Sequence, residues 1–306
     1  TLYRRRTPPT QVFPATGRDR PFRFIDIEIP ETAPPGQPIP VTYEWAGPWA
    51  QLQPGLVLLK WVNRQDENQF WLHDHGVGFG NLQSSSAEPD DAFRVVETTA
   101  MLPPEDLPIG TYQLEAAYLN RETGEEQMLE IPEISIVIDS AAEVLPAPEP
   151  DYVSQLYHLA QSLPQGRPGL DPIFAQIGRI NQYDAVQDYL QQAEASLALR
   201  QEQDPENLSH LYALALTHAL QEDAPNTLAA MEKIRDIAPE NPYHHAYVAF
   251  VNLYLGRSGA ARAAIAPALK AEPENPDFQV LDGVGALFQG NLIRAFRVGR
   301  QVAPLL

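Results

Sequence analysis

The chain contains no cysteine among its 306 residues. This absence excludes disulfide bonds, thiol catalysis and zinc sites built on cysteine, and it leaves the cellular compartment open. No apolar run approaches the roughly 18 residues that a membrane-spanning helix needs. Basic residues are also scarce, with 21 Lys and Arg against 40 Asp and Glu and a formal net charge of −19. Because phosphate binding needs a basic surface, we expect no nucleic-acid partner.

The chain also lacks an initiator Met and an apolar signal segment, so we expect a processed or truncated product. Residues 1–21 form a polar, Pro-rich lead that contains Arg4, Arg5 and Arg6. Two interpretations of the three arginines stay open. They are either the positive flank of a removed membrane segment or an incidental charge on a disordered tail.

A fixed period organises the second half of the chain. Pro-Glu-Asn triplets begin at Pro205, Pro239 and Pro273, which are 34 residues apart. A period of this length is typical of stacked helix–turn–helix units. Proline suits the junction between units because it cannot continue one helix but is tolerated in the first turn of the next.

Small residues keep the same period inside the expected helices, and glycines fall between them. The small residues are Ala215, Ala249 and Gly283 in the first helices and Thr227, Ala261 and Ala295 in the second, with Gly256 and Gly290 at the turns. This pattern resembles the tetratricopeptide (TPR) repeat. The resemblance implies an α-helical solenoid over 152–306 with a degenerate first repeat, and it implies that the first helix of each unit lines a groove for a partner protein.

The first half has a different pattern. Runs of alternating or β-branched residues predict about seven strands, at 22–29, 39–45, 56–62, 69–74, 93–101, 111–119 and 129–138. We therefore expect an Ig-like or fibronectin-like antiparallel β-sandwich over 22–138. A phase change at Phe24 predicts a bulge, Gly124 predicts a hairpin turn, and Tyr112 predicts a tyrosine corner. The Pro-rich stretch 139–151 is the expected linker.

The stretch from Leu102 to Tyr112, with the Asn120 to Glu125 hairpin, is similar to β-sandwich domains on the extracytoplasmic ends of bacterial, cyanobacterial-type membrane glycosyltransferase-related proteins. The resemblance carries no catalytic residue. It implies a place outside the cytoplasm, in the periplasm or thylakoid lumen, and association with a membrane.

Potential metal-ligand side chains cluster at His73-Asp74-His75, which is followed by Gly76, Gly78 and Gly80. His73 and His75 share one face of a strand, yet two ligands do not make a metal site and no third one is evident. The glycines lack the following helix of a dinucleotide fingerprint. We therefore predict no metal, no cofactor and no catalytic residue, and hence a protein that is not an enzyme.

The four tryptophans all lie in the first half, at Trp45, Trp49, Trp61 and Trp71. They form either the core of the sandwich or an exposed strip that contacts sugar rings, and the core interpretation is favoured because aromatics dominate core energetics.

The TPR resemblance implies an apolar and aromatic groove for a partner protein. Its lining residues are Tyr212, Leu216, Tyr243, Tyr247, Phe250, Tyr254, Val284 and Phe288. The alternative is that the chain fills its own groove, for example with the helix expected at 152–163 or with the sandwich.

Arg294, Arg297 and Arg300 form a basic strip on the last helix. The strip suits an acidic partner or lipid headgroups, or it is a solvated helix face with basic residues near a C-terminus.

Together these features favour a non-enzymatic scaffold or assembly protein whose solenoid holds another protein, in association with a membrane complex. The alternative is an accessory domain of a polysaccharide or glycosyl-transfer system, with glycan contact by the sandwich.

Overall fold

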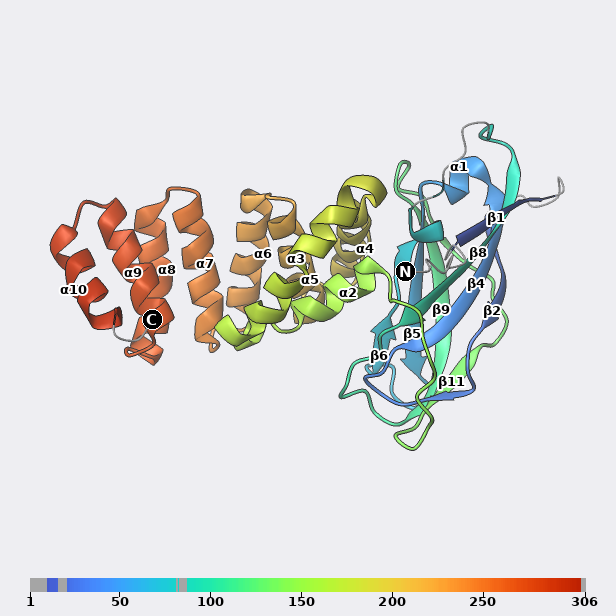
Figure 1. The fold of residues 1–306 in the computed structure, drawn as a ribbon, viewed down its shortest axis with the longest axis horizontal. Helices are drawn as coiled ribbons and strands as arrows, with labels where there is room; N and C mark the ends of the chain where they lie inside the picture. Colours follow the sequence, from blue (N-terminus) through green and yellow to red (C-terminus); the bar gives the residue numbers. More distant parts are fainter. Residues whose placement is uncertain (1–9, 16–20, 81, 83–86, 304–306) are drawn as a thin grey trace, which may run out of the picture. The chain divides into compact units, whose positions relative to one another are not determined.

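The computed structural model describes residues 10–15, 21–80, 82 and 87–303, without the side chains at 177, 179–187, 301 and 302. A β-sheet half is followed by a helical half, as the sequence predicts (Figure 1). The chain packs into two compact units. The first comprises Thr1–His158 and Gln182–Ser196, and the second comprises Leu159–Asn181 and Leu197–Leu306. The Arg4–Arg6 strip and most of the expected lead lie outside the described residues.

The first unit contains two sheets. One has the strand order β1-β8-β4-β2, and the other has the order β3-β11-β9-β5-β6, with β10 on β9 and β7 on β5. The strands are β1 (Thr10–Pro14), β2 (Arg23–Glu28), β3 (Thr32–Ala33), β4 (Ile39–Pro48), β5 (Gly55–Asn63), β6 (Phe70–Leu72), β7 (His75–Gly76), β8 (Ala92–Met101), β9 (Gly110–Asn120), β10 (Glu126–Met128) and β11 (Ser135–Ile138). The strand pairs of the described residues are antiparallel apart from β3 with β11.

Three local features predicted from the sequence are confirmed in this unit. The β2–β4 register shifts between Phe24 and Asp26, where the phase change predicts a bulge. Gly124 has φ 71° in the turn between β9 and β10, a conformation that only glycine adopts freely. The Tyr112 hydroxyl donates a hydrogen bond of 2.8 Å to the carbonyl of Pro108 and forms the tyrosine corner.

The core of the first unit is built from the alternating inward side chains of both sheets. Its largest fully buried members are Trp45, Trp61, Tyr43, Tyr112, Tyr118 and Phe22. The strands β4 and β9 alternate between buried and half-buried positions over much of their length, which is the pattern of a sheet with one face on the core.

The helices are α1 (Trp49–Leu52), α2 (Tyr152–Ala160), α3 (Arg167–Gln187), α4 (Tyr189–Gln203), α5 (Leu208–Leu220), α6 (Ala224–Ile237), α7 (Pro242–Tyr254), α8 (Ser258–Ala271), α9 (Pro276–Phe288) and α10 (Leu292–Val302), with the short 3₁₀ segments η1 (Val77–Gly80) and η2 (Leu163–Gln165). No helix of the described residues is both long and apolar enough to cross a membrane.

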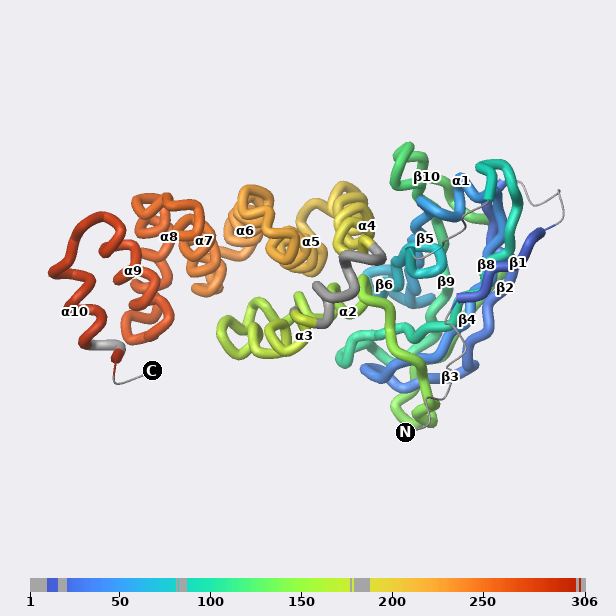
Figure 2. The backbone as a smooth tube through the Cα atoms, turned by 45° about the horizontal axis from the view of Figure 1, so that its top comes forward, coloured from blue at the N-terminus to red at the C-terminus, as the bar shows by residue number. Residues whose placement is uncertain are grey.

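The helices α5 to α10 form three hairpins in strict phase (Figure 2). The first helices begin at Leu208, Pro242 and Pro276, and the second helices begin at Ala224, Ser258 and Leu292, so each start repeats after 34 residues. The Asn of each Pro-Glu-Asn triplet is the N-cap of the next helix. The side chains of Asn207, Asn241 and Asn275 accept hydrogen bonds from the backbone N–H of His210, Tyr243 and Asp277.

Small residues allow the paired helices to approach closely, as expected. Ala215, Ala249 and Ala261 are buried, and a Cβ on Gly283 of α9 would meet the Val298 side chain of α10 at 2.8 Å. The turns at Gly256 and Gly290 have φ of 73° and 77°, which favours glycine at these positions.

The structure differs from the sequence prediction at three places. Residues 10–14, placed in the extended lead, form β1 and pair with β8. The short strands β3, β7 and β10 were not predicted. A proline favours the first turn of a helix, which predicts a helix start at Pro172, but α3 begins five residues earlier at Arg167 and carries Pro172 in its second turn.

Candidate functional site

The predicted groove residues lie on the first helices of the three hairpins, but their exposure divides them. Tyr212 and Leu216 on α5 are buried, and Tyr243, Tyr247 and Val284 are half-buried. Phe250, Tyr254 and Phe288 are 58%, 70% and 62% exposed. The groove therefore has a covered part and an open part, and the division falls inside α7.

The covered part is occupied by the chain's own segment around η2. The Tyr247 hydroxyl donates a hydrogen bond of 2.8 Å to the carbonyl of Leu163, and Asn241 Nδ2 donates one of 2.9 Å to the carbonyl of Pro164. Gly166 lies so close to the Tyr243 ring that a Cβ there would meet ring carbons at 2.2 Å. At this end the chain therefore fills its own groove, which is the alternative that the sequence leaves open.

A hydrogen-bonded pair lies beside the covered part. The Tyr212 hydroxyl and His244 Nε2 are 2.8 Å apart, and His244 Nδ1 is 2.8 Å from the carbonyl of Ala238. Burial lowers the pKa of His244, so the neutral ring donates to the carbonyl and accepts from the tyrosine. Burial likewise raises the pKa of Tyr212 to about 12. Both polar groups are satisfied, so this pair is part of the packing of α5 on α7.

The open part is an apolar surface on α7 and α9. Tyr254 and Phe288 occupy equivalent positions 34 residues apart, and Leu287 beside Phe288 is 49% exposed. Phe250 lies one turn before Tyr254 on the same face of α7. We call these four residues, Phe250, Tyr254, Leu287 and Phe288, the open groove.

The three arginines of the basic strip also differ in their contacts. Arg294 Nε lies 2.8 Å from Asp282 Oδ2 on α9, where Arg262 also pairs with the same carboxylate at 3.3 Å. Arg297 and Arg300 are exposed and make no ion pair with any residue that the structure describes. The first arginine therefore holds α10 to α9, and the other two face solvent.

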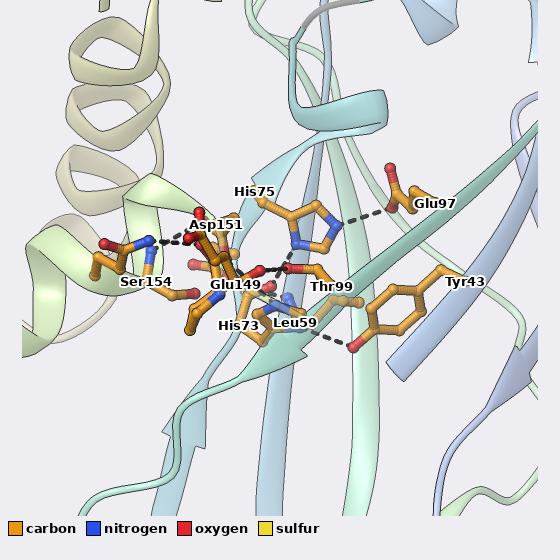
Figure 3. Close-up of polar contacts among 12 residues, drawn as sticks. Tyr43, Leu59, His73, His75, Glu97, Thr99, Glu149, Asp151 and Ser154 are labelled. Atoms are coloured by element: carbon orange, nitrogen blue, oxygen red, sulfur yellow. Dashed lines mark hydrogen bonds and ion pairs between the residues drawn. The ribbon is translucent and has the colours of Figure 1, made fainter. Parts of the chain in front are cut away.

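The histidine motif of the first unit belongs to a buried cluster of titratable groups (Figure 3). His75 Nε2 lies 2.9 Å from Glu97 Oε1, and His75 Nδ1 lies 2.9 Å from the carbonyl of His73. His73 Nδ1 is 2.9 Å from the Tyr43 hydroxyl, and its Nε2 faces Asp151 Oδ2 at 3.3 Å. Glu97 also accepts hydrogen bonds from Trp45 and from the backbone of Gly78.

The charges of this cluster follow from its burial. Burial alone would lower the pKa of His75, but the charge of Glu97 and its hydrogen bond outweigh burial and raise the pKa to about 9. Burial lowers the pKa of His73, which stays neutral. Burial alone would raise the pKa of Asp151, but the hydrogen bond with His73 and the positive charge of His75 outweigh it, so the carboxyl is ionised. The cluster thus holds an imidazolium–carboxylate pair beside a neutral histidine that faces a second carboxylate.

The structure adds Asp151 to the two histidines as a third potential metal ligand, which the sequence does not reveal. Ligand atoms of His73, His75 and Asp151 lie within 4.8 Å of one another in a fully buried setting. Both ring nitrogens of His75 are already donors, however, so a metal would have to displace a proton and break a hydrogen bond. The arrangement favours an ion-pair network that fixes the start of α2, where Asp151 also accepts from the Ser154 N–H at 2.9 Å.

Two helical residues of the first unit, Gln192 and Ser196, form buried hydrogen bonds with the segment that carries the histidines. Asp74 accepts hydrogen bonds of 2.8 Å from the Leu59 N–H and from the Ser196 hydroxyl. Gln192 Oε1 accepts one of 3.1 Å from the Gly76 N–H. These contacts explain why residues 182–196 pack in the first unit.

The tryptophans are core residues in the main. Trp45, Trp61 and Trp71 are buried, and Trp49 is half-buried with its ring 5.4 Å from that of Phe93. The core interpretation is therefore confirmed for three of the four.

Comparisons with known proteins give a limited result. No family model matches the chain, and no curated protein matches it at a significant level. A solved structure described as a MamA RS-1 ArsTM double mutant is similar, at 14% identity and a TM-score of 0.36, over 43% of this chain and 74% of that one. A likeness this low carries no argument about function. None of these comparisons supports the resemblance to glycosyltransferase-related proteins.

Proposed function

We propose that the protein is a non-enzymatic interaction module, and that the open groove binds an apolar segment of a partner protein. The observation that carries the proposal is the exposure of four large apolar side chains on neighbouring helices, at 49% to 70% each, while the rest of the groove is covered. Contiguous exposed apolar surface of this kind is typical of protein–protein contact sites. Stacked helical repeats present such surfaces without chemistry of their own.

The geometry of the partner segment follows from the shape of the open groove. Phe250 and Tyr254 lie one turn apart at the end of α7, and Leu287 and Phe288 are consecutive residues at the end of α9. An amphipathic helix that lays its apolar face on exposed side chains of two neighbouring helices is a recurring mode of recognition. We therefore propose a helical segment with apolar residues at i, i+3/i+4 and i+7.

The buried histidine cluster supports the non-enzymatic part of the proposal. His73, His75 and Glu97 are 0% to 1% exposed, so a substrate has no access to them in this conformation. A general acid or base must come within hydrogen-bond reach of the substrate. The alternative function, glycan contact by the sandwich, depends on exposed tryptophans, and the burial of three of them removes its main support.

We further propose that the partner belongs to a membrane complex on the extracytoplasmic side. The test is a pull-down from detergent-solubilised membranes of the source organism, with the tag at the N-terminus. Phe250→Asp and Tyr254→Asp place a charge in the open groove and should each abolish recovery of the partner. Phe296→Ser, an exposed aromatic on α10 of the same unit, is the matched control and should leave recovery unchanged.

Two results would contradict this proposal. Equal recovery of a defined partner by wild type and by both groove variants would show that the open groove is not the contact. Recovery of the partner from the soluble fraction alone would be consistent with binding at the open groove but would contradict the proposal of a membrane complex. Circular dichroism should be the same for all variants, because these side chains are exposed.

A further inference from the structure

The helix α10 carries a second exposed apolar surface that the open groove does not include. Leu292, Ile293 and Phe296 are 65%, 77% and 70% exposed, the highest values among large apolar residues of the last hairpin. Arg297 and Arg300 follow on the same outward side, because Val298 packs inward against α9. We call Leu292, Ile293, Phe296, Arg297 and Arg300 the outer face of α10.

The charge around this face is unlike that of the rest of the chain. The sequence has no Asp or Glu after Asp282, and Asp282 is itself paired with Arg262 and Arg294. In a protein of net charge −19, Arg297 and Arg300 are thus cations without a neighbouring acid among the described residues.

We propose that the outer face of α10 binds the surface of an anionic lipid bilayer. The apolar side chains of Leu292, Ile293 and Phe296 would enter the headgroup layer, and the two arginines would extend to lipid phosphates. A short helix with exposed Leu and Phe on one side and Arg beside them is the pattern of an interfacial helix. Arginine reaches the polar layer from such a position because its aliphatic stem lies along the apolar surface.

The other repeats indicate why lipid is favoured over the helix of a partner protein. The residues equivalent to Phe296 in the two preceding repeats are Leu228 in α6 and Arg262 in α8. Both are covered where a further hairpin follows, since Leu228 is 6% exposed and Arg262 pairs with Asp282 of α9. The residues equivalent to Ile293 are Pro225 in α6 and Gly259 in α8, and both stay exposed even though a hairpin follows them. A helix stacked in the same way would cover Phe296 and leave Ile293 in water, whereas a bilayer surface takes both.

A second copy of the chain is disfavoured by charge. A symmetric contact of α10 with α10 places Arg297 and Arg300 of both copies in one interface, to which α10 contributes no acidic group. Like charges placed opposite each other in a contact oppose association.

The test is co-sedimentation of the purified full chain with vesicles. Vesicles of phosphatidylcholine alone should bind weakly, and vesicles that also contain phosphatidylglycerol should bind strongly. Raising the ionic strength from about 0.1 M to about 1 M should release the protein, because screening shortens the reach of charge interactions. Arg297→Gln with Arg300→Gln should weaken binding to anionic vesicles by about 25-fold, at about fivefold for each arginine.

Phe296→Ser should weaken vesicle binding by about tenfold or more, because a large apolar side chain no longer enters the headgroup layer. Phe250→Ser is the matched control, since it removes an equally exposed aromatic from the open groove and should leave vesicle binding unchanged. The proposal is independent of the proposed function, because each of the two surfaces has its own variant.

Four outcomes would overturn the proposal. They are the absence of binding to anionic vesicles, equal binding to both kinds of vesicle, equal binding by the wild type and the α10 variants, and a concentration-dependent dimer that Phe296→Ser abolishes. The last would assign the face to a second copy. Circular dichroism of the variants should match the wild type, so that a loss of binding is not a loss of fold.

Discussion

The ion pair between His75 and Glu97 should make the stability of the first unit depend on pH. The pair is fully buried, with Nε2 and Oε1 2.9 Å apart, and Glu97 raises the pKa of His75 from 6.5 to about 9. Because the folded-state pKa is the higher one, the folded state binds the proton more tightly than the unfolded state does. The stabilisation is therefore complete below pH 6.5 and is lost as the pH rises through 9.

The size of the effect follows from the pKa difference. One pKa unit corresponds to about 1.4 kcal/mol, so a rise from 6.5 to about 9 gives a loss of about 3 kcal/mol across this window. This is a large part of the total stability of a typical domain, which is about 5–15 kcal/mol. The free energy of unfolding should thus fall by about 1.4 kcal/mol for each pH unit between pH 6.5 and 9.

Tryptophan fluorescence measures this unit selectively, because Trp45, Trp49, Trp61 and Trp71 all belong to it. Urea unfolding should be followed at a series of pH values. Glu97→Gln keeps one acceptor oxygen, for Trp45 or for Gly78, but removes the charge, so the slope between pH 6.5 and 9 should disappear.

Glu44→Gln is the matched control, because it removes a carboxylate from the neighbouring strand β4 where Glu44 pairs with Arg94 in partial contact with solvent. It should leave the slope unchanged. A wild-type protein whose unfolding free energy is flat over this window, or a Glu97→Gln variant with the wild-type slope, would refute the reasoning.

Three further substitutions test local parts of the fold. Tyr112→Phe removes the hydrogen bond to the Pro108 carbonyl and should lower the stability of the first unit by about 1 kcal/mol in the fluorescence assay. Gly166→Ala places a methyl group against the Tyr243 ring at φ 70° and should destabilise the helical unit by about 2 kcal/mol or more, measured by far-UV circular dichroism. Glu222→Gly should instead stabilise that unit by about 0.5–1 kcal/mol, because Glu222 has φ 60° at the position that is Gly256 and Gly290 in the next hairpins. An unchanged or lower melting temperature for Glu222→Gly would contradict the assumption of backbone strain.

The helical period could be predicted from the sequence because it depends on local chemistry. Each Pro-Glu-Asn triplet ends one helix and starts the next, with the Asn side chain as the N-cap. Such signals lie within a few residues of the boundary that they set, so the three helix starts at Leu208, Pro242 and Pro276 keep the spacing of 34 residues.

The strands of the sandwich could be predicted where apolar residues alternate or cluster, and not where a strand is very short or exposed along its length. The seven predicted strands correspond to β2, β4, β5, β6, β8, β9 and β11. The strand β1 was missed because its residues are exposed or half-buried, so that no alternation marks them. Its place is set by pairing with β8, and pairing across so many residues leaves no local signal.

The buried cluster shows the same limit for site residues. His73 and His75 were evident as a pair because the sequence predicts one strand whose face they share. The structure instead places His73 between β6 and β7, and His75 begins β7. Glu97 lies on another strand and Asp151 follows a Pro-rich stretch, and neither has a sequence pattern that points to the histidines. Only the folded chain brings them together, and the charge of Glu97 then decides that His75 is a cation rather than a free ligand.

The groove shows why a period does not determine a binding site. Residues at equivalent positions, such as Leu216, Phe250 and Val284, have the same place on their helices but differ in exposure. A non-repeating segment adds a further difference between the repeats, since η2 and Gly166 lie against Tyr247 and Tyr243 of α7. A partner that competes for the covered part has to break the Tyr247–Leu163 hydrogen bond and expose buried side chains, whereas the open groove is accessible without rearrangement. Binding at Phe250 and Tyr254 should therefore leave η2 in place, and protection of the backbone amides of 163–166 from hydrogen exchange should be the same with and without the partner.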